Sequence, residues 1–200
     1  MSTIVLIVEG DTERAAKDHL KRFLDSHSGE RPKARLKPVA LDGGLSERRV
    51  RGLAEGVLRD PSVSGVIALT DLYPKFASAE DALQTLRSWL PADTRCHAAV
   101  AKHDFEAWLL VGWEAIVRQA RVGNRQPWGA HPEEIDGNNP PAHRLSALFQ
   151  QGPHPRRYKK PIDGKKLFEQ TDLAGAAEQC PELRRFLNCL LSCAGYPPLP

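Results

Sequence analysis

Four acidic residues in this sequence have the residue type and the spacing of a metal site. Glu9 directly follows an apolar run, and Glu13 comes four residues later. Asp71 follows a second apolar run, and Glu106 lies shortly after a third. Carboxylates held close together repel one another unless a cation or a shared proton intervenes. We therefore expect these side chains to hold Mg²⁺ or Mn²⁺, because such ions bind carboxylates and keep waters for substrate phosphates.

The apolar runs before these acids predict strands of one parallel sheet. Residues 4–8 are Ile-Val-Leu-Ile-Val, a run that is typical of a strand buried on both faces. Residues 63–69 and 96–101 predict two more strands, and helical patterns separate the runs. This alternation predicts an α/β fold with a parallel sheet, helices on both faces and right-handed crossovers. Such sheets bind ligands at the carboxyl ends of their strands, where Glu9 and Asp71 fall.

Further elements complete this expected domain, which spans residues 1–120. Residues 34–40 predict another strand, and Pro38 within it indicates an edge position. The expected helices are 45–58, 79–89, 104–119 and one that runs from Asp11 or Thr12 to residue 26. Because acidic residues favour the first turn of any helix, Glu13 and Glu106 also have a purely structural explanation.

Residues 121–200 differ from the first part, because turn-forming prolines and glycines are frequent in them. Helices are expected at 142–149, 163–170 and 183–193, the last of them preceded by Pro181 at a first-turn position. We therefore expect a helical, loop-rich C-terminal extension that packs on the first domain.

A dense basic cluster lies in this extension. It consists of Arg156, Arg157, Tyr158, Lys159 and Lys160. We expect its cations to contact phosphates and its aromatic ring to stack on a base, which makes DNA or RNA a candidate partner. The alternative is a solvated basic loop.

His103, three residues before Glu106, is a candidate for proton transfer because its imidazole titrates near neutral pH. A histidine that caps the following helix is the alternative.

The composition of the 200 residues sets wider limits. The net charge of +3 is compatible with a nucleic-acid partner but does not by itself indicate one. No secretory signal and no apolar stretch of about 20 residues is present, so we expect a cytoplasmic protein that does not cross a membrane. The four cysteines form no CxxC pair, and a zinc site built from three of them would lack a fourth ligand.

Several motifs together resemble the Toprim (topoisomerase–primase) superfamily. Residues 8–13, Val-Glu-Gly-Asp-Thr-Glu, resemble its EGxTE motif, as found in the overcoming-lysogenization-defect nuclease branch. Residues 70–74 lie where Toprim domains carry DxD, and residues 103–109 resemble the H-E-F-E-A-x-L motif of a Toprim-like bacterial family of unknown function. Residues 133–145 and 158–160 are similar to the later pattern of that family.

The resemblance implies a Toprim-like fold with a metal-dependent phosphodiester site. Glu9 matches the general acid/base or metal-binding glutamate, and Asp71 matches the first aspartate of DxD. Glu13 and Glu106 would be further ligands. Tyr73 stands where the second aspartate would be, which removes one ligand. By family position, Arg144 and Lys160 would reach a substrate.

Three functions remain open from the sequence. The first is a Mg²⁺-dependent nuclease or nicking enzyme, with the resemblance implying an effector role in a bacterial defence system. The second is a non-catalytic Toprim-like subunit that binds an ATPase or nucleic acid, which Tyr73 favours. The third is a small-molecule phosphotransfer enzyme, which no glycine-rich phosphate loop supports. The oligomeric state also stays open.

Overall fold

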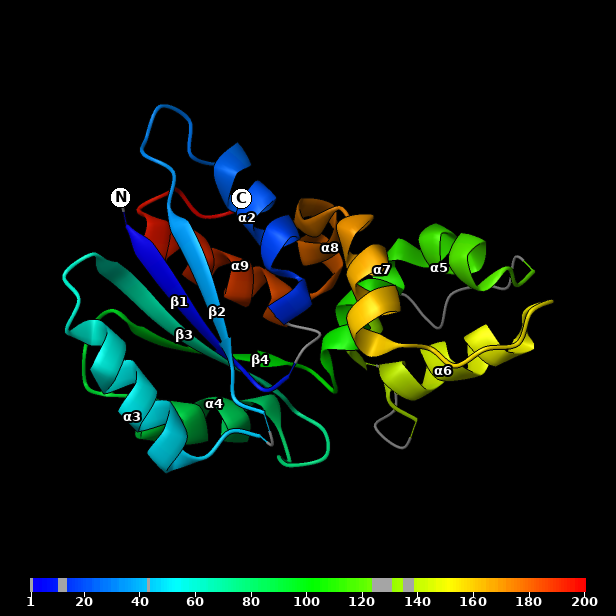
Figure 1. Cartoon of the computed structure of the whole chain (residues 1–200), viewed down its shortest axis with the longest axis horizontal. Helices are drawn as coiled ribbons and strands as arrows, with labels where there is room; N and C mark the ends of the chain where they lie inside the picture. The colour runs from blue at the N-terminus through cyan, green and yellow to red at the C-terminus, as the bar shows by residue number, and fades with distance from the viewer. Residues whose placement is uncertain (1, 11–13, 43, 124–130, 135–138) are drawn as a thin grey trace.

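Four parallel strands form one sheet at one end of the molecule (Figure 1), in the order β2-β1-β3-β4. The computed structural model describes residues 2–10, 14–42, 44–123, 131–134 and 139–200. The strands are β1 (Thr3–Val8), β2 (Arg35–Ala40), β3 (Val63–Asp71) and β4 (Cys96–Ala101). The predicted α/β fold with a parallel sheet is confirmed.

Strand β1 lies inside the sheet, as its unbroken apolar run requires, and residues 4 to 8 are all fully buried. Strand β2 lies at one edge, where the missing N–H of Pro38 is tolerated. The chain passes from β1 to β2 on one side and then to β3 on the other. The point between β1 and β3 is therefore the switch point of the topology, where open α/β sheets bind ligands.

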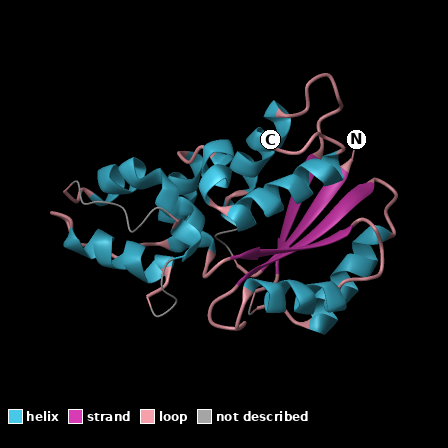
Figure 2. Ribbon diagram, turned by 180° about the vertical axis from the view of Figure 1, so that it is seen from behind, coloured by secondary structure: helices cyan, strands magenta, loops and turns pink. Residues whose placement is uncertain are grey.

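Helices cover both faces of the sheet (Figure 2). The helices α2 (Lys17–Ser26) and α9 (Pro181–Ala194) pack on the face to which Ile4 and Leu6 point. The helices α3 (Glu47–Leu58) and α4 (Ala79–Trp89) cover the opposite face. Successive residues of β1 thus alternate between two apolar cores, as the period of two in a strand dictates.

A group of shorter helical segments lies beyond the carboxyl end of β4 (Figure 1). In chain order they are η1 (Phe105–Gly112), α5 (Trp113–Ala120), η2 (Pro132–Glu134), α6 (Pro141–Gln151), η3 (Lys160–Gly164), α7 (Lys165–Glu169) and α8 (Leu173–Gln179). These segments and α9 form the helical C-terminal part of the fold.

The prediction of a single helix over residues 104–119 is wrong. A 3₁₀ segment, η1, runs from Phe105 to Gly112, and the α-helix α5 begins only at Trp113. Residues 105 to 110 are all buried, so η1 has no solvent-facing side and its path is decided by the packing around it. The helix α8 was also not predicted, and the expected start of α2 at Asp11 or Thr12 lies outside the described residues.

The last helix, α9, joins the two parts of the chain. It packs against β1, β3 and β4, and Gly65 of β3 leaves room for the side chain of Cys193. The buried carboxylate of Glu133 accepts hydrogen bonds from the backbone N–H groups of Glu182 (3.0 Å) and Leu183 (3.2 Å), which satisfies the N-terminus of α9. In the described part of the chain, none of the helices has the length and apolarity to cross a bilayer.

Candidate functional site

Glu9 lies at the carboxyl end of β1, next to the end of β3. Its Oε1 accepts a hydrogen bond from the hydroxyl of Thr70, and its Oε2 forms an ion pair with Lys75 Nζ at 2.7 Å. Thr70 is buried, whereas Lys75 remains about 42% exposed. The carboxylate is therefore held by a buried hydroxyl on one side and by a partly exposed cation on the other.

Asp71 ends β3 and ties the exit of this strand to the exit of β4. Its Oδ1 accepts a hydrogen bond of 2.9 Å from the backbone N–H of Phe105, at the start of η1. The N–H of Tyr73 donates to the carbonyl of His103 at 2.7 Å. The loops after β3 and β4 are thereby joined, and the acidic residues on them are brought to one place.

Asp104 and Glu106 are buried carboxylates on the β4 side of this edge. Asp104 is 5% exposed and Glu106 is fully buried. Asp104 Oδ2 accepts a 3.1 Å hydrogen bond from the N–H of Ala142, whereas Oδ1 has no hydrogen-bond partner within the described residues. Burial and the neighbouring charge of Glu106 raise the pKa of Asp104 to about 7.

Lys160 is the cation that these carboxylates share. Its Nζ lies 3.2 Å from Glu106 Oε2. Burial lowers the pKa of Lys160, but the negative charges of Glu106, Asp71 and Asp104 act against it and leave the pKa above its ordinary value. Lys160 therefore stays charged and offsets part of the negative charge of three acidic side chains.

The buried Tyr158 also contacts this group of acidic side chains. Its hydroxyl donates a long hydrogen bond, 3.5 Å, to Glu106 Oε1, and its ring lies against Phe149 with 5.4 Å between the ring centroids. Burial raises the pKa of Tyr158, and the charges of Glu106, Asp163 and Asp104 raise it further. The tyrosine is therefore a neutral donor.

His103 occupies the turn between β4 and η1. Its backbone φ of 72° is in the left-handed region, which side-chain-bearing residues rarely adopt. Such conformations cluster at functional sites, because the surrounding structure must hold them in place. The predicted proton-transfer residue thus directly precedes Asp104 and lies in the turn before η1, which contains Glu106.

The model of a domain of unknown function, DUF4276, matches residues 8–191. The chain belongs to the DUF4276 family. No curated protein and no solved structure matches the chain. The match spans β2, β3 and β4 and most of the helical part, and all the described acidic residues of the site lie within it.

The charges of two of the four predicted ligands of this DUF4276 chain, Asp71 and Glu106, act on Lys160. Glu9 lies on the neighbouring strand β1, where it contacts Thr70 of β3. Glu13 lies outside the described residues. Among the residues that are described, no three His, Cys, Asp or Glu side chains form a group that could hold a metal ion. The carboxylates instead pair with Thr70, with lysines and with backbone N–H groups.

The predicted nucleic-acid-binding residues of the DUF4276 chain divide into exposed and engaged side chains. Arg157 and Lys159 are exposed. Arg156 forms a two-point ion pair with Asp163 (2.7 and 2.9 Å) and stacks over Phe149. The remaining members are Arg144, whose Nε donates to the carbonyl of Asn139, the buried Tyr158, and Lys160, whose ammonium group pairs with Glu106. With its ring buried, Tyr158 does not offer a surface for base stacking.

Sequence reasoning missed two members of the site, Asp104 and Lys75. Asp104 lies within the motif at residues 103–109, but its burial, which makes it unusual, depends on packing against α6. Lys75 lies 66 residues from Glu9 in the sequence, and nothing in the local pattern of either residue indicates that they meet. An unpartnered buried oxygen was the available sign for Asp104, and it exists only in the folded chain.

Proposed function

We propose that the carboxyl edge of the sheet is a divalent-metal site that cleaves nucleic-acid phosphodiesters, in a fold of the Toprim type. The observation that carries the proposal is the group of carboxylates around Lys160. Glu106 pairs with its ammonium group directly, and the charges of Asp71 and Asp104 act on the same group. Glu9 adds a further carboxylate at the switch point, where open α/β sheets bind ligands.

The donor chemistry fits a hard cation. The candidate ligand atoms are carboxylate oxygens, which Mg²⁺ and Mn²⁺ prefer. One of them, Oδ1 of Asp104, is buried and has no hydrogen-bond partner in the described part of the chain. The described carboxylates do not form a metal-binding group as they stand. Lys160 would therefore move aside and Asp71, Asp104 and Glu106, with Glu9, would shift together to hold the ion, and Glu13 would join them by its position in the family motif. The ion would polarise a phosphoryl oxygen and lower the pKa of a water bound to it.

The residues of the chain have separate roles in this proposal. Glu9, oriented by Thr70, would accept a proton from the attacking water. Lys160, released from Glu106, would pair with a non-bridging phosphate oxygen, since its long side chain is already about 47% exposed. His103 would supply a proton to the leaving oxygen. The exposed cations of Arg157 and Lys159, with Arg144 nearby on α6, would contact the nucleic-acid backbone.

The test compares cleavage with metal binding. Purified protein is incubated with supercoiled plasmid and with single-stranded DNA and RNA, in Mg²⁺ or Mn²⁺. Glu9→Gln and Asp71→Asn are expected to abolish cleavage. Glu55→Gln, an exposed glutamate on α3, is the matched control and is expected to leave it unchanged. Cleavage that persists in both site variants would refute the assignment of these residues.

A second function has its own observation. Tyr73 replaces the second aspartate of DxD and is about 46% exposed beside the site, so an apolar ring stands where a ligand would. This favours a non-catalytic subunit that uses the edge to bind nucleic acid or a partner ATPase. Mn²⁺ binding measured by calorimetry distinguishes the two functions. Binding that Asp71→Asn removes, without cleavage by the unaltered protein, would support the subunit and exclude the nuclease.

A further inference from the structure

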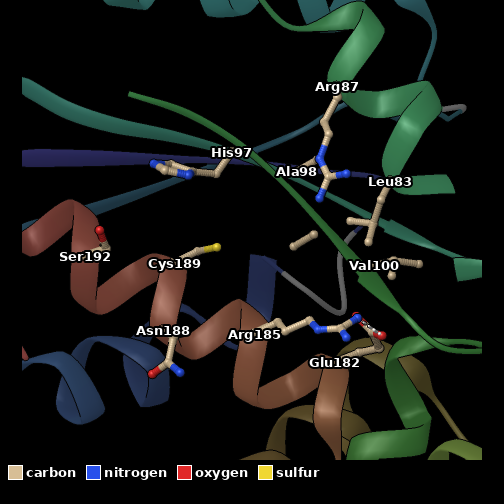
Figure 3. Close-up of a pocket in the computed structure, with 11 residues that line it drawn as sticks. Leu83, Arg87, His97, Ala98, Val100, Glu182, Arg185, Asn188, Cys189 and Ser192 are labelled. Carbon is tan, nitrogen blue, oxygen red and sulfur yellow. Dashed lines mark hydrogen bonds and ion pairs between the residues drawn. The ribbon is translucent and has the colours of Figure 1, made fainter. Parts of the chain in front are cut away.

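The open edge of β4 lies in a groove between helices from the two faces of the sheet (Figure 3). The cavity there measures about 400 Å³, which is within the range of ligand sites in proteins. Leu83 and Arg87 line it from α4, and Arg185 and Asn188 line it from α9. No strand of the described chain pairs with β4 on this side.

The backbone of β4 presents hydrogen-bonding groups to this groove. The carbonyl of Arg95 accepts from Val66 N (2.8 Å), and the carbonyl of Ala101 accepts from Leu72 N (3.0 Å), so these two residues face β3. In a parallel ladder alternate residues face the same neighbour. Residues 97 and 99 therefore also face β3, and Ala98 directs its backbone N–H and C=O groups to the groove, whereas the next outward-facing residue, Val100, is buried.

The two edges of the sheet differ in how well their residues prevent pairing with another strand. At the other edge, β2 contains Pro38, which lacks an N–H, and exposed basic side chains at Arg35 and Lys37. Natural sheets use such residues to prevent strand pairing at an edge. Strand β4 has no proline, and the side chain of Ala98 is small enough for another backbone to approach.

Two guanidinium groups stand over the β4 groove, one from each side (Figure 3). The side chains of Arg87 and Arg185 are about 61% and 66% exposed. Arg87 lies 3.7 Å from Glu80, itself mostly exposed, and Arg185 pairs with Glu182 at 2.6 Å. A guanidinium carries five N–H donors, so each arginine retains donors for a carboxylate.

We propose that the β4 groove binds an extended acidic segment of a partner protein, which pairs with β4 as an added strand. Backbone hydrogen bonds to Ala98 would give affinity, and the arginines would select acidic side chains. A second copy of this chain is a poorer occupant. Pairing two β4 edges around a two-fold axis would bring the arginines of one groove towards those of the other. This inference is independent of the metal site.

The geometry also predicts the spacing of the acidic residues. Successive side chains of a strand point to opposite faces of a sheet. Arg87 comes from the helix layer on one face and Arg185 from the layer on the other. One carboxylate for each arginine therefore requires an odd spacing, such as two adjacent acidic residues, and not acidic residues at alternate positions.

The experiment uses fluorescence anisotropy with the full chain and a fluorescein-labelled peptide, Val-Thr-Glu-Asp-Val-Thr-Val. Arg87→Glu and Arg185→Glu are each expected to raise the Kd about tenfold, the effect of losing one favourable charge pair. Arg48→Glu, a reversal at an exposed arginine on α3, is the matched control and should leave the Kd unchanged. Circular dichroism verifies that each variant is folded.

Altered peptides test strand pairing itself. Two versions are N-methylated at alternate residues, one at the odd and one at the even positions. A paired strand uses one set of N–H groups, so one version should lose binding and the other should retain it. Equal binding by both versions, equal binding of a peptide with lysines in place of the acids, or no binding up to about 1 mM would each overturn the proposal. A dimer that Arg87→Glu dissociates, without peptide binding, would assign the groove to a second copy and overturn it too.

Discussion

Replacing Asp104 with asparagine should make the protein more stable at neutral pH, although it removes a carboxyl group that accepts a hydrogen bond. The folded chain raises the pKa of Asp104 from about 3.8 to about 7, through burial and the charge of Glu106. Between these two values the folded state holds a proton that the unfolded state has released. Stability must therefore fall as the pH rises through this range, and stay low above pH 7.

The size of the effect follows from the two pKa values. Each pKa unit corresponds to about 1.4 kcal/mol, so ionising Asp104 lowers the free energy of unfolding by about 4 kcal/mol well above pH 7. At pH 5 the loss is only about 1.7 kcal/mol, because the folded state is still protonated. Asparagine keeps an oxygen for the N–H of Ala142 and carries no charge. The advantage of Asp104→Asn should therefore grow by about 3 kcal/mol from pH 5 to pH 8.

Urea unfolding, followed by circular dichroism at several pH values in metal-free buffer, measures this advantage. Asp42→Asn, at an exposed aspartate, is the control and should show no comparable trend. A difference between Asp104→Asn and the unaltered protein that is constant with pH, or that shrinks as the pH rises, would refute the reasoning. It would mean that Asp104 is solvated or paired in the folded chain.

Four further outcomes follow from the structure. Gly65→Ala should destabilise the protein by about 1–3 kcal/mol in urea unfolding, because its Cβ would overlap the side chain of Cys193. Gly56→Ala, on α3 with open space around it, should stabilise the protein by up to about 1 kcal/mol in the same assay. Glu133→Gln should cost about 1–3 kcal/mol, since an amide NH₂ cannot accept the N–H groups at the start of α9. Lys160→Ala should tighten Mn²⁺ binding in calorimetry, because the ammonium competes with the ion; weaker or unchanged binding would contradict this.

The sheet was predictable because its determinants are local. Residues 4–8 form a buried apolar run in the sequence and a central strand in the fold, and Pro38 identified the edge strand. The helices α4 and α9 were likewise predicted, and Pro181 begins α9 as expected. The prediction of one helix after β4 was wrong because residues 105 to 110 are nearly all apolar. Such a run has no hydrophobic periodicity that would indicate the type of helix or where it begins.

The candidate site was predictable only in part. The strand ends located Glu9 and Asp71, because the topology of a parallel sheet brings such ends together. The lysines that neutralise the carboxylates come from far away: Lys160 is 54 residues from Glu106. Tyr158 has charged neighbours that suggest an exposed ring, yet packing against Phe149 buries it. Charge balance and burial are properties of the whole fold, and the local sequence does not contain them.

The position of α9 has a consequence for the growing chain on the ribosome. All four strands are complete once residue 101 has been made, but one face of the sheet awaits a helix that begins at Pro181. At about 5–20 residues per second, the 93 residues from 101 to 194 take roughly 5–20 s to add. During that interval apolar side chains of the strands have α2 but no α9 to cover them. The nascent chain is thus expected to expose part of one face of the sheet to chaperones that bind apolar segments until residue 194 has been made.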